Sequence, residues 1–204
     1  MGKLTVLNSV TLDGVMQAPA RPDEDRRDGF GYGGWARPYQ DAVLAERMAQ
    51  GMASGQTRGG GLLLGRRTYE DFYRVWPSRG GNPYTEVLTS TQKYVASSTL
   101  AEPLPWQNST LLTGDVPQAV ARLKEQHPDK DLMILGSGAL IHSLLPHHLI
   151  DEFVLLIYPL VLGSGRRLFP AGTSVALRLT DAVTTTTGVL IATYRPAGPA
   201  AGAS

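Results

Sequence analysis

The stretch GGGLLLGRRTYEDF, residues 59–72, decides the fold of this chain. Within it, GLLLG (61–65) is too short for a helix and has turn residues at both ends, so it predicts a buried strand. TYEDFY (68–73) then begins like a helix, with Thr68 as the capping residue. A strand that leads directly into a helix is typical of an α/β protein.

The turn between this strand and this helix carries an anion-binding pattern. Gly65, Arg66 and Arg67 occupy the turn, and Glu70 and Asp71 follow in the expected first helical turn. Ligands of open α/β sheets bind at the carboxyl ends of strands, and a helix start with unpaired N–H groups favours phosphate. Two guanidinium groups add bidentate donors. The spacing is not that of a P-loop, because the lysine is absent and the Ser/Thr is displaced by one. Ordinary solvated charge is an equally good interpretation of this turn taken alone.

A second glycine turn follows the same design in DLMILGSGALIHSLL, residues 131–145. Gly136 and Gly138 let a pyrophosphate approach the backbone, and Ser137 adds a hydroxyl donor. As a dinucleotide fingerprint the turn is incomplete, because Ile141 stands where the third glycine of G-x-G-x-x-G belongs. Taken alone, such a glycine pair more often marks close packing of a helix on a strand. Two phosphate-compatible turns on one sheet suit a dinucleotide with a 2′-phosphate, so the sequence predicts NADPH as the cofactor.

The rest of the chain alternates apolar runs with amphipathic segments. Strands are expected at 3–10, 61–65, 92–97, 109–113, 131–136, 152–161, 174–183 and 188–195, and helices at 38–54, 68–75, 115–127 and 138–146. This alternation predicts an α/β fold, with a central, mostly parallel sheet and helices on both faces. The last two strands are joined by TTTTG, which leaves no room for a crossover helix, so they should form an antiparallel hairpin.

Length and composition restrict the class of protein. With 204 residues, 42% of them hydrophobic and 18% charged, the chain fits one domain over residues 1–196 and a flexible tail at 197–204. A net charge of +1 without long basic runs argues against a nucleic-acid partner, and no stretch approaches the ~20 apolar residues of a membrane span. A composition without cysteine excludes disulfides and thiolate metal sites and suits the cytoplasm, and the four histidines show no metal-ligand spacing. The polar loop at 20–34 is either a flap over the site or a disordered insertion.

Four segments, in this order, resemble the dihydrofolate reductase superfamily. They are SVTLDGVM (9–16), LLLGRRTYEDF (62–72), KYVASSTL (93–100) and the run from ILGSGALIHSLLP to LVLGSGRRLF (134–169). The chain looks most like stand-alone proteins related to the reductase domain of the bifunctional riboflavin-biosynthesis deaminase-reductase, and the resemblance runs from about residue 3 to residue 195. It implies a dihydrofolate reductase-like three-layer fold, NADPH as hydride donor, and a homodimer.

The resemblance also assigns cofactor contacts by position. Arg66 corresponds to the arginine that meets the adenosine 2′-phosphate, with Arg67 and Thr68 at the phosphate-facing start of the helix. The other positions are Gly65 beside them, Ser97 and Ser98 near the adenine ribose, Leu135, Gly136, Ser137, Gly138, Ala139 and Leu140 around the pyrophosphate and nicotinamide, and Asn8, Ser9, Asp13, Val15 and Met16 beside the nicotinamide ring. The deaminase half of the bifunctional enzyme would need H-x-E with P-C-x-x-C to hold zinc. Since the chain has no cysteine, only reduction is expected.

The proton donor is the open position. Dihydrofolate reductases place an acidic side chain early in the first helix, and here Trp35 has the familiar aromatic position, with Asp41 behind it and Gln40 aligning about as well. A carboxylate beside a hydrophobic pocket would have a raised pKa and could relay a proton. Asp41 also suits an exposed first-turn aspartate favoured by the helix dipole. Asp13 is the second catalytic candidate, although LDG is equally good turn chemistry.

The expected reaction is NADPH-dependent reduction of a small heterocyclic or ribosyl-pyrimidine substrate. The resemblance suggests 5-amino-6-(5-phosphoribosylamino)uracil, reduced at the ribosyl carbonyl carbon, with protonation by water or by Asp41. The pair Arg166–Arg167 is either a site for the substrate phosphate or plain loop charge. Two alternatives stay open: dihydrofolate reduction, for which the chain shows no clear match to the folate-glutamate arginine, and a non-catalytic NADPH-binding or sensor protein.

Overall fold

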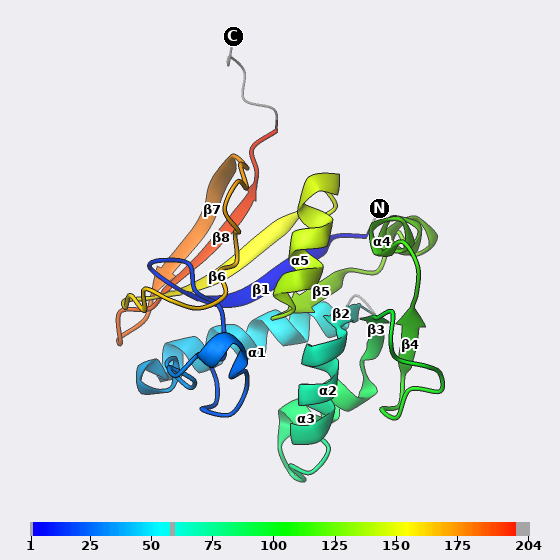
Figure 1. Cartoon of the computed structure of the whole chain (residues 1–204), viewed down its shortest axis with the longest axis horizontal. Helices are drawn as coiled ribbons and strands as arrows, with labels where there is room; N and C mark the ends of the chain where they lie inside the picture. Colours follow the sequence, from blue (N-terminus) through cyan, green and yellow to red (C-terminus); the bar gives the residue numbers. More distant parts are fainter. Residues whose placement is uncertain (1, 58–59, 199–204) are drawn as a thin grey trace.

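The computed structural model describes residues 2–57 and 60–198, and within them the chain forms an eight-stranded sheet (Figure 1). The strands are β1 (Leu4–Thr11), β2 (Gly61–Gly65), β3 (Gln92–Ala96), β4 (Ser109–Leu112), β5 (Leu132–Leu135), β6 (Glu152–Tyr158), β7 (Leu177–Thr184) and β8 (Leu190–Pro196). Their order across the sheet is β4-β3-β2-β5-β1-β6-β8-β7. Neighbours are parallel from β4 to β6, whereas β8 is antiparallel to both β6 and β7. The expected mostly parallel sheet and C-terminal hairpin are confirmed.

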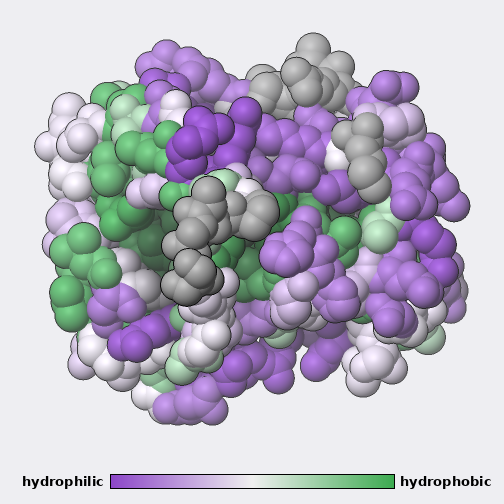
Figure 2. Space-filling view, turned by 90° about the horizontal axis from the view of Figure 1, so that it is seen from above, coloured by the Kyte–Doolittle hydropathy of each residue, from purple (hydrophilic) through white to green (hydrophobic). Residues whose placement is uncertain are grey.

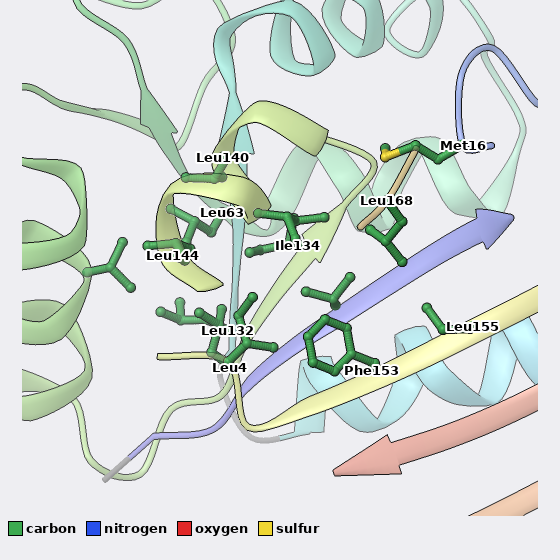
Figure 3. Packing of buried hydrophobic residues seen from close by; sticks show 14 of the residues in the cluster. Leu4, Met16, Leu63, Leu132, Ile134, Leu140, Leu144, Phe153, Leu155 and Leu168 are labelled. Carbon is green, nitrogen blue, oxygen red and sulfur yellow. The ribbon is translucent and has the colours of Figure 1, made fainter. Parts of the chain in front are cut away.

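Helices cover both faces of this sheet. They are α1 (Ala42–Thr57), α2 (Arg66–Val75), α3 (Pro83–Ser90), α4 (Val116–Gln126) and α5 (Gly138–Leu144), with 3-10 turns at Arg27–Gly29, Arg37–Tyr39 and Leu145–His147. Leu63 of β2 packs with α4 and α5, whereas its neighbours Leu62 and Leu64 pack with α2 and α3, because successive strand residues point to opposite faces. Figure 3 shows Leu140 and Leu144 of α5 lying over the sheet in the first of these cores. The three-layer fold is therefore confirmed.

The start of α2 differs from its prediction. The helix begins at Arg66, and Gly65, with an extended backbone, is its N-cap without any side-chain cap hydrogen bond. Thr68 is therefore not the capping residue, and Glu70 and Asp71 lie beyond the first turn. The prediction was wrong because it placed the start at the best capping side chain, whereas β2 leads into the helix with no linker.

Two other helical segments also depart from the predictions. The first long helix begins at Ala42 rather than at residue 38, because Arg37–Tyr39 forms a separate 3-10 turn with Pro38 near its start. The short helix α3 was not predicted; it begins after Asn82, whose side chain accepts a hydrogen bond from the N–H of Tyr84 at 2.9 Å. The Asn-Pro pair before it was the available signal.

Lys93 ties β3 to the end of α3. The side chain is fully buried, and its Nζ donates to the carbonyl oxygens of Leu88 at 2.8 Å, Thr89 at 3.2 Å and Thr91 at 2.6 Å. It also lies 4.5 Å from the centre of the Trp106 ring. Burial lowers the pKa of Lys93 to about 8. The last carbonyl groups of a helix have no N–H donor within the helix, and the Lys93 ammonium group supplies donors to them at the end of α3.

The last strand, β8, ends at Pro196. The tail predicted for residues 197–204 lies outside the described residues from position 199 onward. Of the helices in the described part of the chain, none combines the length and the apolar character needed to span a membrane.

Candidate functional site

The two glycine turns lie next to each other at the carboxyl end of the sheet. β2 and β5 are parallel neighbours, so Gly65 and Gly136 lie at the same edge. The N–H of Gly65 donates to Ser137 Oγ at 3.0 Å, and Ser137 Oγ donates to the carbonyl oxygen of Leu135 at 3.1 Å. A Cβ atom on Gly136 would lie 3.6 Å from Thr68 Oγ1. The structure thus brings these five predicted residues together.

The turn after β5 has a left-handed backbone. The φ angle is +59° at Gly136 and +58° at Ser137. This conformation costs a non-glycine residue about 1–2 kcal/mol, so Ser137 depends on its hydrogen bond with Gly65. Ala139 and Leu140 follow at the start of α5, where Ala139 is exposed and Leu140 packs into the core. The exposed part of this turn is therefore mostly backbone.

Arg66 stands at the helix start beside these turns. Its Nη1 lies 3.2 Å from both carboxylate oxygens of Glu70, and 38% of the side chain is exposed. Arg67 is also exposed. An exposed i,i+4 ion pair contributes only about 0.3–0.5 kcal/mol, whereas phosphate can accept two charge-assisted bonds from guanidinium. The Arg66 guanidinium can therefore exchange Glu70 for a phosphate.

Asn8 of β1 and Met16, in the loop after β1, border the second glycine turn. The buried Asn8 donates from Nδ2 to the carbonyl oxygen of Gly136 at 3.3 Å, and the same atom lies 3.8 Å from Met16 Sδ. A Cβ on Gly138 would lie 2.9 Å from Met16 Sδ. Val15 is fully buried, so its side chain is part of the core. Of the predicted residues in this segment, Asn8 and Met16 reach the turn.

Ser97 and Ser98 follow the end of β3, one strand further along the same edge. Ser97 Oγ accepts hydrogen bonds from the N–H groups of Thr99 at 3.1 Å and Leu100 at 3.0 Å. Ser98 is exposed. The Ser97 hydroxyl is therefore already part of a local turn, whereas Ser98 is open to solvent.

Asp13 joins two loops. Its carboxylate accepts from Thr11 Oγ1 at 2.5 Å and from the N–H groups of Leu162 at 3.2 Å and Gly163 at 2.9 Å. The hydrogen bond from Thr11 is the main cause that lowers the pKa of Asp13. The contacts correspond to the turn role that the sequence left open, and they do not turn this carboxylate toward the glycine turns.

Asp41 caps α1 and holds the β7–β8 hairpin. Its carboxylate accepts from Thr186 Oγ1 at 2.6 Å, from the N–H of Leu44 at 2.8 Å and from the N–H of Thr187 at 3.2 Å. These bonds, the one from Thr186 first, lower the pKa of Asp41 to about 2. Such a carboxylate is ionised at neutral pH and has no proton to give. The arrangement fits the helix-start interpretation of Asp41 rather than that of a proton donor.

Replacing Asp41 by alanine should lower the melting temperature by about 2–4 °C, since the helix loses its cap. The pKa is lower in the folded state than its usual value of 3.8, so the contribution of Asp41 is complete above about pH 4 and is lost as the pH falls towards 2. Thermal unfolding followed by circular dichroism at pH 7 and pH 3 measures both effects. A difference between wild type and variant that grows on acidification would contradict this assignment.

A second polar group lies on the α1 face of the sheet. Tyr158 is fully buried, with its ring centre 5.1 Å from that of Trp35 and 5.6 Å from that of Tyr39. Burial raises the pKa of Tyr158, and hydrogen bonding from Ser9 and Gln40 opposes this rise. The group is neutral and polar. The sequence did not identify Tyr158, because its partners come from segments more than a hundred residues away.

The pair Arg166–Arg167 lies on the loop that follows β6. Arg166 pairs with Asp28 at 2.8 Å. Arg167 is exposed, and its backbone carbonyl oxygen lies 3.2 Å from His142 Nε2. The next residue, Leu168, is buried. This geometry corresponds to loop charge for Arg166 and leaves the Arg167 side chain in solvent.

The chain also has a cavity of about 160 Å³ at the opposite end of the strands from the glycine turns. It is lined by Gly61, Gln92, Tyr94, Leu123, His127, Lys130 and Leu132. Gly61, Gln92 and Leu132 are the first residues of their strands. The cavity therefore lies at the amino ends of β2, β3 and β5, away from the glycine turns.

Comparisons with known proteins agree with this geometry. The model of the RibD C-terminal domain family matches residues 2–191. The protein YyaP of Bacillus subtilis, whose function is uncharacterised, is 31% identical over 140 residues, which are 65% of this chain and 72% of YyaP. A structure assigned to riboflavin biosynthesis from Shewanella sp. PV-4 is 24% identical, with a TM-score of 0.70 over 95% of this chain and 98% of that chain.

The comparison extends to one protein that has two named activities. The diaminohydroxyphosphoribosylaminopyrimidine deaminase/5-amino-6-(5-phosphoribosylamino)uracil reductase of Thermotoga maritima is 13% identical, with a TM-score of 0.58. The match covers 96% of this chain but 56% of that protein. At such identities the structural likeness shows a shared fold.

Proposed function

The chain belongs to the RibD C-terminal domain family, and from this premise we propose that it is an NADPH-dependent reductase of a small heterocyclic or ribosyl-pyrimidine substrate. The observation that carries the proposal is the contact between the two glycine turns, Gly65 N–H to Ser137 Oγ at 3.0 Å, with Arg66 at the adjoining helix start. A nucleotide with phosphates several ångströms apart fits two neighbouring turns better than one. The family resembles the reductase of the riboflavin pathway, and the substrate we propose is 5-amino-6-(5-phosphoribosylamino)uracil.

The residues present fit the cofactor. Arg66 would recognise the 2′-phosphate, and the backbone N–H groups at Gly136 and Gly138 would face the pyrophosphate. Gly138 also leaves room for Met16, because a Cβ atom there would lie 2.9 Å from Met16 Sδ. Arg67, Thr68, Ser97 and Ser98 would complete the adenosine side, and Leu135, Ser137, Ala139 and Leu140 the pyrophosphate side. Asn8, Ser9 and Met16 would form the wall near the nicotinamide, whereas Asp13 and Val15 would support this wall from the loop and the core. When bound, NADPH supplies the hydride, and the role of the chain is to position the acceptor beside it.

The proton for this reduction would come from water. We do not retain Asp41 or Asp13 as proton donors, because both carboxylates accept several hydrogen bonds and have lowered pKa values. Neutral groups, Ser9 and Gln40, lie beside the buried Tyr158 hydroxyl instead. Such groups can orient a substrate carbonyl and a water molecule without themselves ionising at neutral pH.

Titration of the purified protein with NADPH and with NADH, followed by quenching of tryptophan fluorescence, tests the cofactor. We expect NADPH to bind more tightly by ~1–3 kcal/mol, which corresponds to roughly 5- to 150-fold, because the 2′-phosphate gains a charge-assisted pair. Equal affinity for both nucleotides, or no binding of either, would remove the cofactor assignment.

Loss of NADPH absorbance with different acceptors tests the substrate. Turnover of the phosphoribosylamino-uracil but not of dihydrofolate is the expected result. Turnover of dihydrofolate would favour the alternative within the superfamily. Tight NADPH binding without oxidation by any pteridine or ribosyl-pyrimidine would favour a sensor protein.

We also propose that the protein is a cytoplasmic homodimer. Strand β7 is at the edge of the sheet, and Val175 and Leu179 are exposed at 37% and 51%. Figure 2 shows hydrophobic residues gathered on the left of the molecule, the side on which β7 and β8 lie in Figure 1. An exposed edge of this kind is typical of contact with a second chain. Light scattering after size exclusion measures the mass, and a monomer would contradict the proposal.

A further inference from the structure

The carboxyl end of β5 lies between two apolar cores on one face of the sheet. One core includes Leu44 of α1, and the other includes Tyr69 of α2 and Leu88 of α3. Met133 and Leu135 of β5 pack against both cores and stay partly exposed. We call these two residues the β5 seam. The seam leads directly to the glycine turn, because Leu135 is the residue before Gly136.

A loop, residues 17–36, starts and ends on the α1 side of this seam. Its two ends are joined by hydrogen bonds from Trp35 Nε1 to the carbonyl oxygen of Gln17 at 2.7 Å and from the N–H of Gly34 to the carbonyl oxygen of Ala18 at 2.8 Å. Trp35 and Ala18 belong to the core that includes Leu44. The loop thus has both ends joined to each other and packed on a core, as a flap over the site requires.

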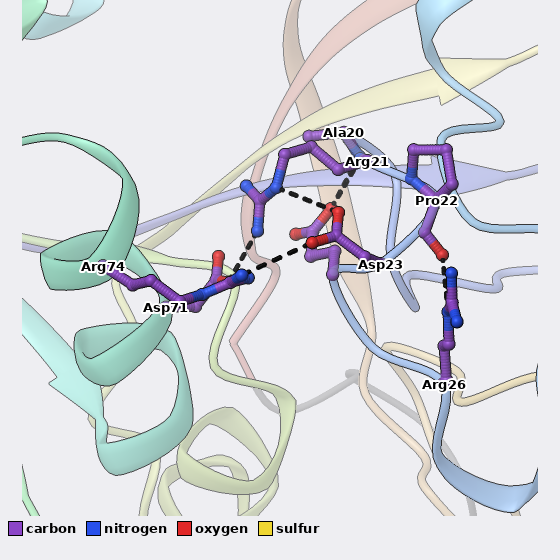
Figure 4. Close-up of polar contacts among 8 residues, drawn as sticks. Ala20, Arg21, Pro22, Asp23, Arg26, Asp71 and Arg74 are labelled. Carbon is purple, nitrogen blue, oxygen red and sulfur yellow. Dashed lines mark hydrogen bonds and ion pairs between the residues drawn. The ribbon is translucent and has the colours of Figure 1, made fainter. Parts of the chain in front are cut away.

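The tip of the loop reaches α2 on the other side. Arg21 Nη2 lies 2.5 Å from Asp71 Oδ1, and this same oxygen lies 2.8 Å from Arg74 Nη2. Asp23 completes the group, at 3.5 Å from Arg21 Nε and 3.4 Å from Arg74 Nη1. Figure 4 shows the four charged side chains meeting between the loop and the helix. The side chains of Arg21 and Asp71 are only 23% and 16% exposed, so this pair is shielded better than most surface pairs.

The shape of the tip places Arg21 for this contact. The carboxylate of Glu24 accepts from the N–H groups of Ala20 at 2.7 Å and Arg21 at 3.1 Å. The backbone of Pro22 lies against Gly33, where a Cβ atom would be 2.7 Å from the Pro22 carbonyl oxygen. The tip is therefore a preformed turn, and its connection to α2 rests on charged side chains.

We propose that Arg21, Asp23, Asp71 and Arg74 form a latch that holds loop 17–36 closed across the β5 seam. Opening this latch admits molecules to the carboxyl end of β5. A latch made of ion pairs opens more often when salt screens the charges, and removing either member of the central pair, Arg21 and Asp71, weakens it. The inference concerns access to the site and goes beyond the reduction proposed above.

The composition of the chain provides a direct test. Since the chain has no cysteine, Leu135→Cys places a single thiol in the seam. The rate at which Ellman's reagent modifies this thiol reports how often the seam is open. We expect Arg21→Gln and Asp71→Asn, each in this background, to raise the rate about 3- to 10-fold, and the double variant to raise it no further. Salt at about 0.5 M should raise the rate of thiol modification in Leu135→Cys towards the rates in the two latch variants.

Arg26→Gln is the matched control. Arg26 is exposed on the same loop, and its Nε donates to the carbonyl oxygen of Pro22 at 3.3 Å, within the loop itself (Figure 4). In the Leu135→Cys background, the thiol of the Arg26→Gln variant should react with Ellman's reagent at the same rate as that of Leu135→Cys alone. A rate unchanged by Arg21→Gln, an additive double variant, or an equal effect of Arg26→Gln would overturn the proposal.

Hydrogen–deuterium exchange of the native chain covers the case in which Leu135→Cys fails to fold. Amide exchange over residues 19–26 should be about 3- to 10-fold faster in Arg21→Gln and Asp71→Asn than in wild type and in Arg26→Gln. Equal exchange in all four proteins would overturn the latch. Neither measurement uses a nucleotide. The latch proposal can therefore be refuted without refuting the proposed reductase activity, and the activity can be refuted without refuting the latch.

Discussion

Replacing Arg66 by glutamine should weaken NADPH binding about 10- to 100-fold and leave NADH binding nearly unchanged. The guanidinium stands at the start of α2, next to the Gly136 turn, and pairs with the exposed Glu70. A bidentate bond to a phosphate is worth roughly 1.5–3 kcal/mol, and NADH lacks the phosphate that would accept it. The loss should therefore appear only with the phosphorylated nucleotide.

The neighbour of Arg66 allows the opposite change. Glu70→Gln removes the carboxylate that competes for the guanidinium, so NADPH should bind about 2-fold more tightly in this variant. Arg122→Gln is the matched control, since Arg122 lies on α4 and bonds Gln118 Oε1 at 2.9 Å in the same i,i+4 geometry. Fluorescence titration of all three variants with both nucleotides gives the comparison. An equal loss for NADH, or a loss in Arg122→Gln, would show that Arg66 does not read the 2′-phosphate.

Replacing Lys93 by methionine should lower the free energy of unfolding by about 2–4 kcal/mol. Methionine preserves the volume, but the carbonyl oxygens of Leu88 and Thr91 lose the hydrogen bond from Lys93 Nζ inside the protein, and each such loss costs roughly 1–3 kcal/mol. Thr89 is affected less, because Asn108 Nδ2 also donates to its carbonyl oxygen at 3.2 Å. For a chain of this length the melting temperature should fall by about 5–15 °C.

The pH dependence separates the charge of Lys93 from its packing. Burial lowers the pKa of Lys93 from 10.5 to about 8, so between these values the unfolded chain binds more protons than the folded one. This group therefore makes the wild type more stable as the pH rises from 8 to 10, and the methionine variant lacks this rise. Urea unfolding at pH 7, 8.5 and 10 measures it, with exposed Lys130→Met as the control, which should stay within about 0.5 kcal/mol of wild type. An unchanged midpoint in Lys93→Met would mean that water replaces the ammonium group.

Local patterns predicted most of the fold. The strand at Gly61–Gly65 has the predicted bounds, because a short run of leucines between glycines is a clear local pattern. The hairpin of β7 and β8 followed from the length of TTTTG. Helix α3 was not predicted, because its start is indicated by the Asn82–Pro83 pair and not by a clear helical period. The placement of Gly65 beside Ser137 follows from the pairing of β2 with β5, which a parallel sheet of alternating strands suggests but does not determine.

The candidate site was less predictable than the fold. Asp41 was named as a catalytic candidate, yet Thr186, 145 residues later, is the first cause of its lowered pKa. Loop 17–36 posed the same difficulty, because Arg21 pairs with a residue 50 positions away. Side-chain partners of this kind arise from the meeting of distant segments, and no local pattern contains them.

The place of β5 in the sheet has a consequence for how the protein is made. β1 pairs with β5 and β6, and both of these strands follow residue 131. A nascent chain that has left the ribosome only as far as Lys130 therefore has β1 without either of its partner strands. It also lacks β5 and the second glycine turn, which follows β5. Such an intermediate exposes apolar, unpaired strand edges to chaperones and proteases. If NADPH binds as proposed, it would stabilise only chains whose synthesis has passed β5.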